Sequence, residues 1–226
     1  MIRAKDFGVM ARRRIKKDFR KLTFAYPVPK GRQRLRELII YIAERYKDAP
    51  LFGAIKLNKT LYHSDFRAYE RFGIPLTGTP YFALRQGPAP KAMVPILNSL
   101  LEEGAIKIEK RQVGNREQKR VVPRRKAFLE LFTGDELALV DEVIKELWDQ
   151  SADDVSNASH DVRWRTVKLK DLIPYEAAFL SQDPLTENDW QSFFSYFNKK
   201  RKPKRKDQID KRNKNDAPEN VRSRGV

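Results

Sequence analysis

The stretch Lys56-Leu57-Asn58-Lys59-Thr60-Leu61-Tyr62-His63-Ser64-Asp65-Phe66 determines how the rest of the chain is interpreted. Apolar residues that recur at about four-residue spacing lie on one face of an α-helix, and that face must be buried. We therefore expect a helix over about 53–71, with Gly73 as its C-cap because glycine readily adopts the left-handed backbone that ends many helices. The side chains expected to face inward are Leu57, Leu61 and Phe66.

The same spacing predicts a helix on each side of this one. The earlier helix ends at Asp48-Ala49-Pro50. The later helix ends at Gly104 and has Pro95 in its first turn, where the missing N–H of proline would have no partner within the helix. The inward face of the earlier helix consists of Leu35, Leu38, Ile39, Ile42 and Tyr46. The inward face of the later helix consists of Met93, Leu97, Leu100 and Leu101.

Capping patterns predict further helices. A hydroxyl side chain followed three residues later by an acid begins the stretches Thr133–Glu136 and Ser151–Asp154, a spacing that caps helix N-termini. Ile173-Pro174-Tyr175-Glu176 predicts a short helix with proline at an early position. A last helix is expected to open at Thr186 and to carry aromatic side chains. These are Trp190, Phe193, Phe194 and Phe197.

Two short β elements complete the expected fold. Tyr81–Leu84 is a strand candidate between segments rich in glycine and proline. Residues 106–108 and 121–122 flank Gly114-Asn115, a turn dipeptide, so we expect a β-hairpin with basic side chains pointing outward. The sequence therefore predicts a mainly α fold with a small β element (α+β).

The charge of the chain is concentrated at its ends. The net charge is +17, but residues 1–36 hold 13 Lys/Arg against two Asp, and residues 199–226 hold 12 against four acidic residues. The body between them is close to neutral, which is not typical of a fold whose surface binds phosphate groups. We expect a basic N-terminal extension over 1–34, one domain over 35–198 and a disordered basic tail over 199–226.

Composition also indicates where the protein resides. No stretch approaches the ~18 consecutive apolar residues of a membrane span, and residues 1–5 have no apolar run of the kind that forms a signal peptide. The chain has no cysteine, which excludes disulfides, thiolate metal sites and a cysteine nucleophile. We expect a soluble protein of the cytoplasm.

Residues that carry chemistry are scarce. Only two histidines exist, and a metal-dependent hydrolase would have to use them with neighbouring carboxylates, as His63 and Asp65 with His160 and Asp161. Ser159 beside His160 is a second candidate, but adjacent residues seldom present the geometry of a nucleophile and its base. No glycine-rich phosphate loop is present. We therefore expect no enzymatic activity, no cofactor and no metal.

The hairpin region carries a basic run that suggests a different function. In a winged-helix-like regulator this hairpin would grip a nucleic-acid backbone, and the helix near 91–103 would read the bases. That helix, however, offers only Lys91, Asn98 and Ser99 to base edges and ends in two acids. Nucleic acid, or an acidic partner, is thus a secondary possibility. The residues that would make these contacts are Arg116, Lys119, Arg120, Arg124, Arg125 and Lys126.

The order of several motifs resembles the Panacea domain of SocA-like antitoxins. Residues 56–66 look like the opening helix of that family, Thr77-Gly78 and Tyr81-Phe82 like its loop and aromatic strand, and Gly87-Pro88-Ala89-Pro90 like its G-P-x-P turn. Ser159-His160-Asp161-Val162-Arg163-Trp164 matches an S-H-x-x-x-W pattern, and 173–176 a closing I-P-Y-E-like run. Pro95 and the two basic ends depart from the pattern or lie outside it.

This resemblance implies a helical domain with a small β element that acts as the antitoxin of a bacterial or phage toxin–antitoxin system, with phage defence as its setting. Inhibition would occur by direct protein–protein contact with a cognate toxin of unknown class. The motif residues are expected to form a structural core cluster, in which His63, Asp65, Ser159, His160 and Trp164 join two helices. The full set is Lys56, Lys59, Tyr62, His63, Asp65, Gly78, Gly87, Pro88, Ser159, His160, Trp164, Pro174, Tyr175 and Glu176.

Overall fold

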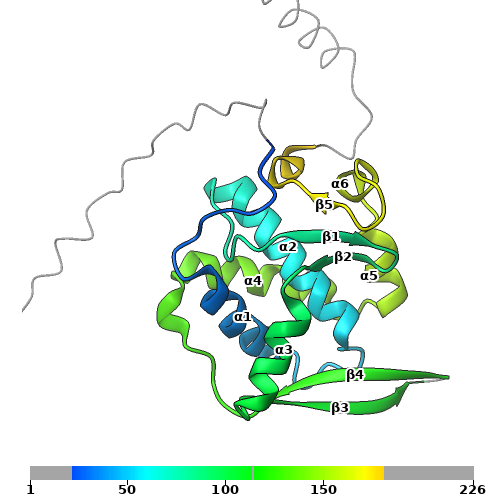
Figure 1. Ribbon diagram of the computed structural model, residues 1–226. Coiled ribbons are helices and arrows are strands. Elements are labelled where there is room, and N and C mark those ends of the chain that lie inside the picture. Colours follow the sequence, from blue (N-terminus) through cyan, green and yellow to red (C-terminus); the bar gives the residue numbers. More distant parts are fainter. Residues whose placement is uncertain (1–21, 114, 181–226) are drawn as a thin grey trace, which may run out of the picture. The chain divides into compact units, whose positions relative to one another are not determined.

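The computed structural model describes residues 22–113 and 115–180, with Arg116 described by its backbone alone. Figure 1 shows the mainly helical α+β arrangement that the sequence predicts. In chain order the elements are α1 (Gly31–Arg45), α2 (Ala54–Phe72), β1 (Tyr81–Leu84), β2 (Gly87–Pro90), α3 (Met93–Glu102), β3 (Ile106–Val113), β4 (Arg116–Pro123), the 3₁₀ helix η1 (Leu129–Leu131), α4 (Gly134–Leu147), α5 (Ala152–Ala158), α6 (Val162–Arg165), β5 (Leu172–Ile173) and the 3₁₀ helix η2 (Tyr175–Phe179).

Helix α2 is the centre of the fold. It packs against α1, α4, α5, β2 and η2, and it passes through the middle of the molecule in Figure 1. Leu57, Leu61 and Phe66 are buried as predicted, and Gly73 ends the helix with a φ of 78°. Because neighbours surround it, α2 also buries polar residues that a surface helix would expose.

Two hydrophobic clusters lie around α2. The larger one joins α1, α3, α4 and the base of the β3–β4 hairpin, and it contains the five residues predicted to form the inward face of α1. The smaller one is aromatic and joins α2 to β1 and η2, with the rings of Phe66 and Tyr175 stacked at 5.0 Å. Both clusters include side chains of α2, so this helix packs against the two of them.

The strands form two separate sheets. β2, β1 and β5 make a three-stranded antiparallel sheet with β2 at one edge, and β3 pairs with β4 over eight residues as the predicted hairpin. The segment Gly87-Pro88-Ala89-Pro90, expected to be a turn, is instead strand β2. Its prolines are compatible with a strand because an edge strand can lack N–H groups on its open side. The turn is formed by Arg85 and Gln86.

Helix α3 faces the core differently from the prediction. Pro95 lies in its first turn as expected, but the buried residues are Met93, Ile96 and Leu100, and Leu101 is 38% exposed. The prediction of Leu101 as an inward residue was therefore wrong. Apolar residues follow α3 nearly all round, so periodicity alone does not determine which of them face the core.

The remaining elements follow their local signals. Thr133 and Ser151 form capping boxes with Glu136 and Asp154 at the starts of α4 and α5. The segment predicted to be a helix from Ile173 begins as strand β5 and continues as η2. The predicted aromatic helix from Thr186, the first 21 residues of the basic N-terminal extension and the tail over 199–226 lie outside the described residues.

Residues 22–30, assigned by sequence to a basic extension, contact the fold. Tyr26 N donates to Gly78 O at 3.0 Å, and Tyr175 N donates to Thr23 O at 2.8 Å. Helix α1 then begins at Gly31. These hydrogen bonds hold residues 23–26 against the loop before β1 and the start of η2.

Candidate functional site

Asp65 is the centre of a buried hydrogen-bond network. Its carboxylate accepts from Thr77 N at 2.7 Å, from the Tyr81 hydroxyl at 2.7 Å and from the Thr77 hydroxyl. Burial raises the pKa of Asp65 to about 6, against the opposing effect of these donors. The network ties α2 to the loop before β1, and Tyr175 extends it by donating to Thr79 O at 2.7 Å. This hydrogen-bond network therefore has a structural role.

A second polar group lies where α2 meets the edge strand. Lys59 is 2% exposed and its Nζ donates to Pro88 O at 2.7 Å. Ser159 is fully buried and donates to Ser156 O at 2.7 Å. Gly87, with a φ of 82°, lies against both side chains, and an added Cβ would stand 2.1 Å from Ser159 Oγ and 2.8 Å from Lys59 Nζ. Only glycine fits this position.

A third group joins α6 to the β1–β2 turn. Trp164 Nε1 donates to Leu84 O at 3.0 Å, and His160 Nε2 lies 3.1 Å from Arg85 O with its ring 4.2 Å from that of Trp164. Asp161 caps α6 and accepts from the Tyr62 hydroxyl at 3.3 Å. Sequence reasoning missed this Tyr62–Asp161 contact, although an Asp directly before a helix is a typical N-cap signal.

The five residues expected to form one cluster are thus distributed over neighbouring groups. His63 is partly buried against the ring of Tyr62, at 5.1 Å, and does not join His160. Burial, followed by the positive charges of Arg67, Arg163 and Lys59, lowers the pKa of His63 to about 3, so the ring is neutral at pH 7. A neutral, separated histidine does not provide the paired site that a hydrolase would need.

The other motif residues also have structural partners. Lys56 Nζ donates to Trp148 O at 2.9 Å and thus ties α2 to the end of α4. Glu176 accepts from Thr23 N at 2.9 Å. Gly78 has a φ of 70° and lies against Tyr26 O, and Pro174 precedes the first residue of η2.

The described residues give little support for a catalytic or metal-binding site. Within 22–113 and 115–180, no group of three or more His, Asp and Glu side chains is placed to hold a metal ion. Ser159 is buried and its hydroxyl donates to a backbone carbonyl, while the ring of adjacent His160 contacts Arg85 O and Trp164. Ser159 and His160 therefore do not form a nucleophile and base pair.

The hairpin exposes less positive charge than its sequence suggests. Arg120, expected to point outward, is 3% exposed and donates to Tyr46 O and Ala49 O at 2.7 Å and to Lys47 O. Arg125 pairs with the buried carboxylate of Glu37 at 2.7 Å. The outward expectation was wrong for Arg120, because the segment after α1 covers that side of β4.

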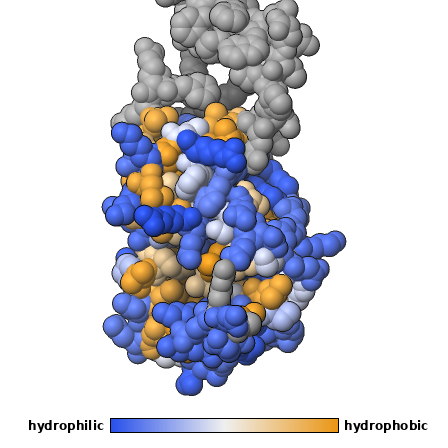
Figure 2. Space-filling model, turned by 90° about the vertical axis from the view of Figure 1, so that its right-hand side faces the viewer, coloured by the Kyte–Doolittle hydropathy of each residue, from blue (hydrophilic) through white to orange (hydrophobic). Residues whose placement is uncertain are grey.

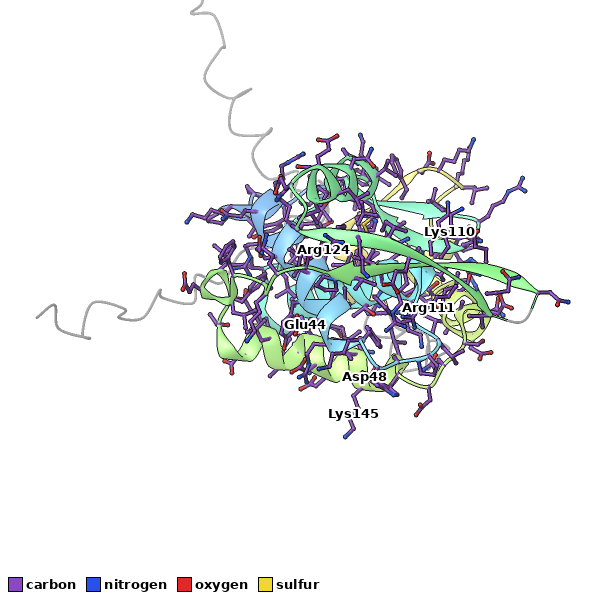
Figure 3. The ribbon with its side chains drawn as sticks, turned by 90° about the horizontal axis from the view of Figure 1, so that it is seen from below. Glu44, Asp48, Lys110, Arg111, Arg124 and Lys145 are labelled. Carbon is purple, nitrogen blue, oxygen red and sulfur yellow. The ribbon has the colours of Figure 1, made fainter. Side chains whose placement is uncertain are left out.

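The remaining charges around the hairpin are mixed in sign. Lys107 and Arg111 pair with Glu109, and Lys110 pairs with Glu117. Figure 3 shows Lys110, Arg111 and Arg124 on the same side of the molecule as Glu44 and Asp48. Within the described ranges, the exposed basic side chains of this region that form no ion pair are Lys119, Arg124 and Lys126.

Helix α3 presents few groups that read bases. Ser99 accepts from Arg36 and donates to Glu103, and Lys91 lies over the ring of Phe82 at 5.6 Å. Val94, by contrast, is 68% exposed, and Leu101 lies seven residues later on the same helix face. The exposed side of α3 thus carries apolar Val94, Pro95 and Leu101 beside Asn98 and Glu102.

Two of the hollows on the surface are lined by motif residues. An open groove of about 1080 Å³ is lined mainly by apolar side chains, including Leu22, Phe24 and Phe179. A smaller pocket of about 350 Å³ lies between α2 and the β1–β2 turn, with Lys59 and Arg85 in its wall. Figure 2 looks onto the face toward which the β1–β2 turn points in Figure 1, and it shows separate hydrophobic areas within a mostly hydrophilic surface.

No described helix is long and apolar enough to span a membrane. Residues 57–165 match the family model described as antitoxin SocA-like, Panacea domain, a range that runs from the first turn of α2 to the last residue of α6. No curated protein and no solved structure matches the chain. The match confirms the resemblance inferred from the motifs: residues 57–165 are similar to the SocA-like Panacea domain.

Proposed function

We propose that this chain is an antitoxin that neutralises a cognate toxin protein by direct binding. The Panacea match over 57–165 is the observation that carries the proposal, because the matched family is described as SocA-like antitoxins. In this proposal the chain acts by stoichiometric contact in the cytoplasm of a bacterium or of a phage-infected cell. It would need neither a cofactor nor a catalytic residue.

The distribution of polar and apolar groups supports a protein partner. The polar motif residues are engaged in holding the fold, as Asp65 is with Thr77 and Tyr81. Large apolar side chains are exposed elsewhere, among them Val94 at 68% and Phe128 at 55%. Protein interfaces combine such apolar contacts with a polar rim. This surface is therefore better suited to a protein than to a nucleic-acid backbone.

Co-expression tests the proposal. The protein encoded beside this chain is expressed from an inducible promoter with and without the chain, and growth and co-purification are measured together. We expect growth to be rescued and the two proteins to elute as one complex. A harmless neighbour, or rescue without a complex, would contradict direct neutralisation.

A winged-helix-like DNA-binding regulator is the second candidate function. The order of α3 followed by the β3–β4 hairpin favours it, together with Lys119, Arg124 and Lys126, which form no ion pair among the described side chains. Such binding would weaken steeply with salt because phosphate contacts release counterions. The exposed apolar side chains of α3 argue against base reading.

A further inference from the structure

The pocket beside the edge strand contains an unusual set of polar groups. Asn58 and Lys59 of α2 form one wall, and Arg85 and Gln86 of the β1–β2 turn form the opposite one. The pocket has a volume of about 350 Å³, which is enough for one side chain with its adjoining backbone. It lies inside the matched Panacea range.

Lys59 is a buried cation without a matching anion. It is 2% exposed, its Nζ donates to Pro88 O, and no acidic side chain of the described residues pairs with it. Burial lowers its pKa to about 7. A buried charge normally costs stability unless it is paired. Lys56 is buried in a similar way, so the feature that distinguishes Lys59 is that it lines a pocket.

Asn58 adds a complementary acceptor. Its Oδ1 is buried and has no hydrogen-bond partner in the described structure. Buried acceptors are rarely left unpaired in native proteins. The pocket wall therefore holds two basic residues, Lys59 and Arg85, next to a buried acceptor that lacks a donor in the described structure. A carboxylate next to an N–H group satisfies both kinds of group at once.

We propose that this pocket receives an acidic side chain of the toxin, whose carboxylate contacts Lys59 and Arg85 while a neighbouring backbone N–H donates to Asn58. The inference rests on the proposed antitoxin function and specifies the chemistry of the partner. Loss of one member of a desolvated, hydrogen-bonded charge pair weakens binding strongly. The acidic residue is thus a major contributor to complex affinity.

Binding to the purified toxin is measured by calorimetry for Lys59→Met, Arg85→Ala and a matched control, Lys56→Met. Lys56 is equally buried on α2 and likewise donates to a backbone carbonyl, but it does not line the pocket. We expect Lys59→Met to weaken binding at least about 30-fold, Arg85→Ala to weaken it about 5-fold, and Lys56→Met to leave it within about 2-fold.

Folding of the variants is checked by thermal melting at pH 6. Lys59→Met removes a cation that burial disfavours, so its melting temperature should not fall below that of Lys56→Met. Arg85 is exposed, and only its backbone carbonyl is used by His160, so Arg85→Ala should melt like the unchanged chain. The binding losses are then attributable to the pocket and not to unfolding.

The outcomes separate this inference from the function on which it rests. If the unchanged chain binds the toxin and all three variants bind equally well, the pocket inference is overturned and the antitoxin function stands. If the unchanged chain does not bind, both are overturned. N-acetylaspartate N-methylamide and acetate are added at equal concentration in NMR titrations of the side-chain amides of Asn58 and Gln86. Stronger shifts with the amide support a polypeptide ligand, whereas equal shifts overturn the toxin contact in favour of a free carboxylate.

Discussion

Replacing Arg120 by Met should destabilise the fold without affecting an exposed basic surface. The guanidinium donates to the carbonyls of Tyr46, Lys47 and Ala49, which follow the C-terminal end of α1, and it lies 5.5 Å from the ring of Phe52. Carbonyls at a helix end have no partner within the helix. Methionine retains the apolar contact but removes all three hydrogen bonds: Tyr46 O and Ala49 O keep the bonds from Ala49 N and Phe52 N, whereas Lys47 O loses the donor that it has in the described structure.

The magnitude follows from the number of lost partners. Leaving Lys47 O unpaired costs about 1–3 kcal/mol, and losing each of the hydrogen bonds to Tyr46 O and Ala49 O costs about 0.5–1.5 kcal/mol, so we expect a total loss of about 3–4 kcal/mol. For a folded region of this size that corresponds to a decrease in melting temperature of roughly 6–16 °C. Circular dichroism during heating and urea denaturation measure both quantities.

Lys119→Met is the matched control for this prediction. Lys119 precedes Arg120 on β4, is exposed and forms no ion pair among the described residues. A substitution there should change stability by less than about 0.5 kcal/mol. Equal melting temperatures for the two variants would refute the assignment of Arg120 to the fold. If Arg120→Met lost DNA affinity while its melting temperature stayed unchanged, the result would instead support a nucleic-acid contact by the hairpin.

Three further predictions test the polar groups around α2. Gly87→Ala should lower the free energy of unfolding by about 2–4 kcal/mol, because the new Cβ would clash with Ser159 and Lys59 at a positive φ. In the control Gly104→Ala no atom lies within 4 Å of the new Cβ, so urea denaturation should show a loss of only about 1–2 kcal/mol, and equal losses would contradict the predicted clash. The pKa of Asp65 is about 6 in the folded state and lies above its ordinary value of 3.8, so the stability that this group contributes is present below pH 4 and falls by about 3 kcal/mol as the pH rises through 6. The difference in unfolding free energy between the unchanged chain and Asp65→Asn should shift by this amount between pH 4 and 7, and a constant difference would refute the role of the buried carboxylate. His160→Ala removes one contact to Arg85 O and one ring contact at a partly exposed site, so urea denaturation should show that the free energy of unfolding falls by about 1 kcal/mol. Unchanged stability with abolished toxin binding would instead place His160 in the interface.

Local signals in the sequence were sufficient for most of the secondary structure. The capping boxes at Thr133 and Ser151 and the glycine at position 73 depend only on neighbours within a few residues, and each marks a helix boundary in the structure. The hairpin around residues 114–115 was likewise predictable from its turn dipeptide. These features need no knowledge of the tertiary fold.

The errors arose where distant segments decide the outcome. Arg120 is buried because residues 46–49 cover β4, a contact across more than seventy residues that strand alternation does not reveal. Gly87–Pro90 forms a strand because it lies at a sheet edge, and sequence patterns do not identify edges. His63 and His160 have different neighbours because the His160 ring lies against Arg85 O and Trp164, whereas the His63 ring lies against Tyr62. The family motifs bring these residues together by sequence order but do not determine which of them touch.

Titration of the purified toxin with this chain tests the central claim most directly. The toxin's activity is measured in vitro, without DNA, at increasing ratios of the chain and at two salt concentrations. Neutralisation by direct binding predicts that activity falls to zero at a fixed stoichiometric ratio and that the endpoint is unchanged by salt. Toxin activity that persists at a large excess of the chain, while the chain binds promoter DNA in a salt-dependent manner, would contradict the antitoxin function.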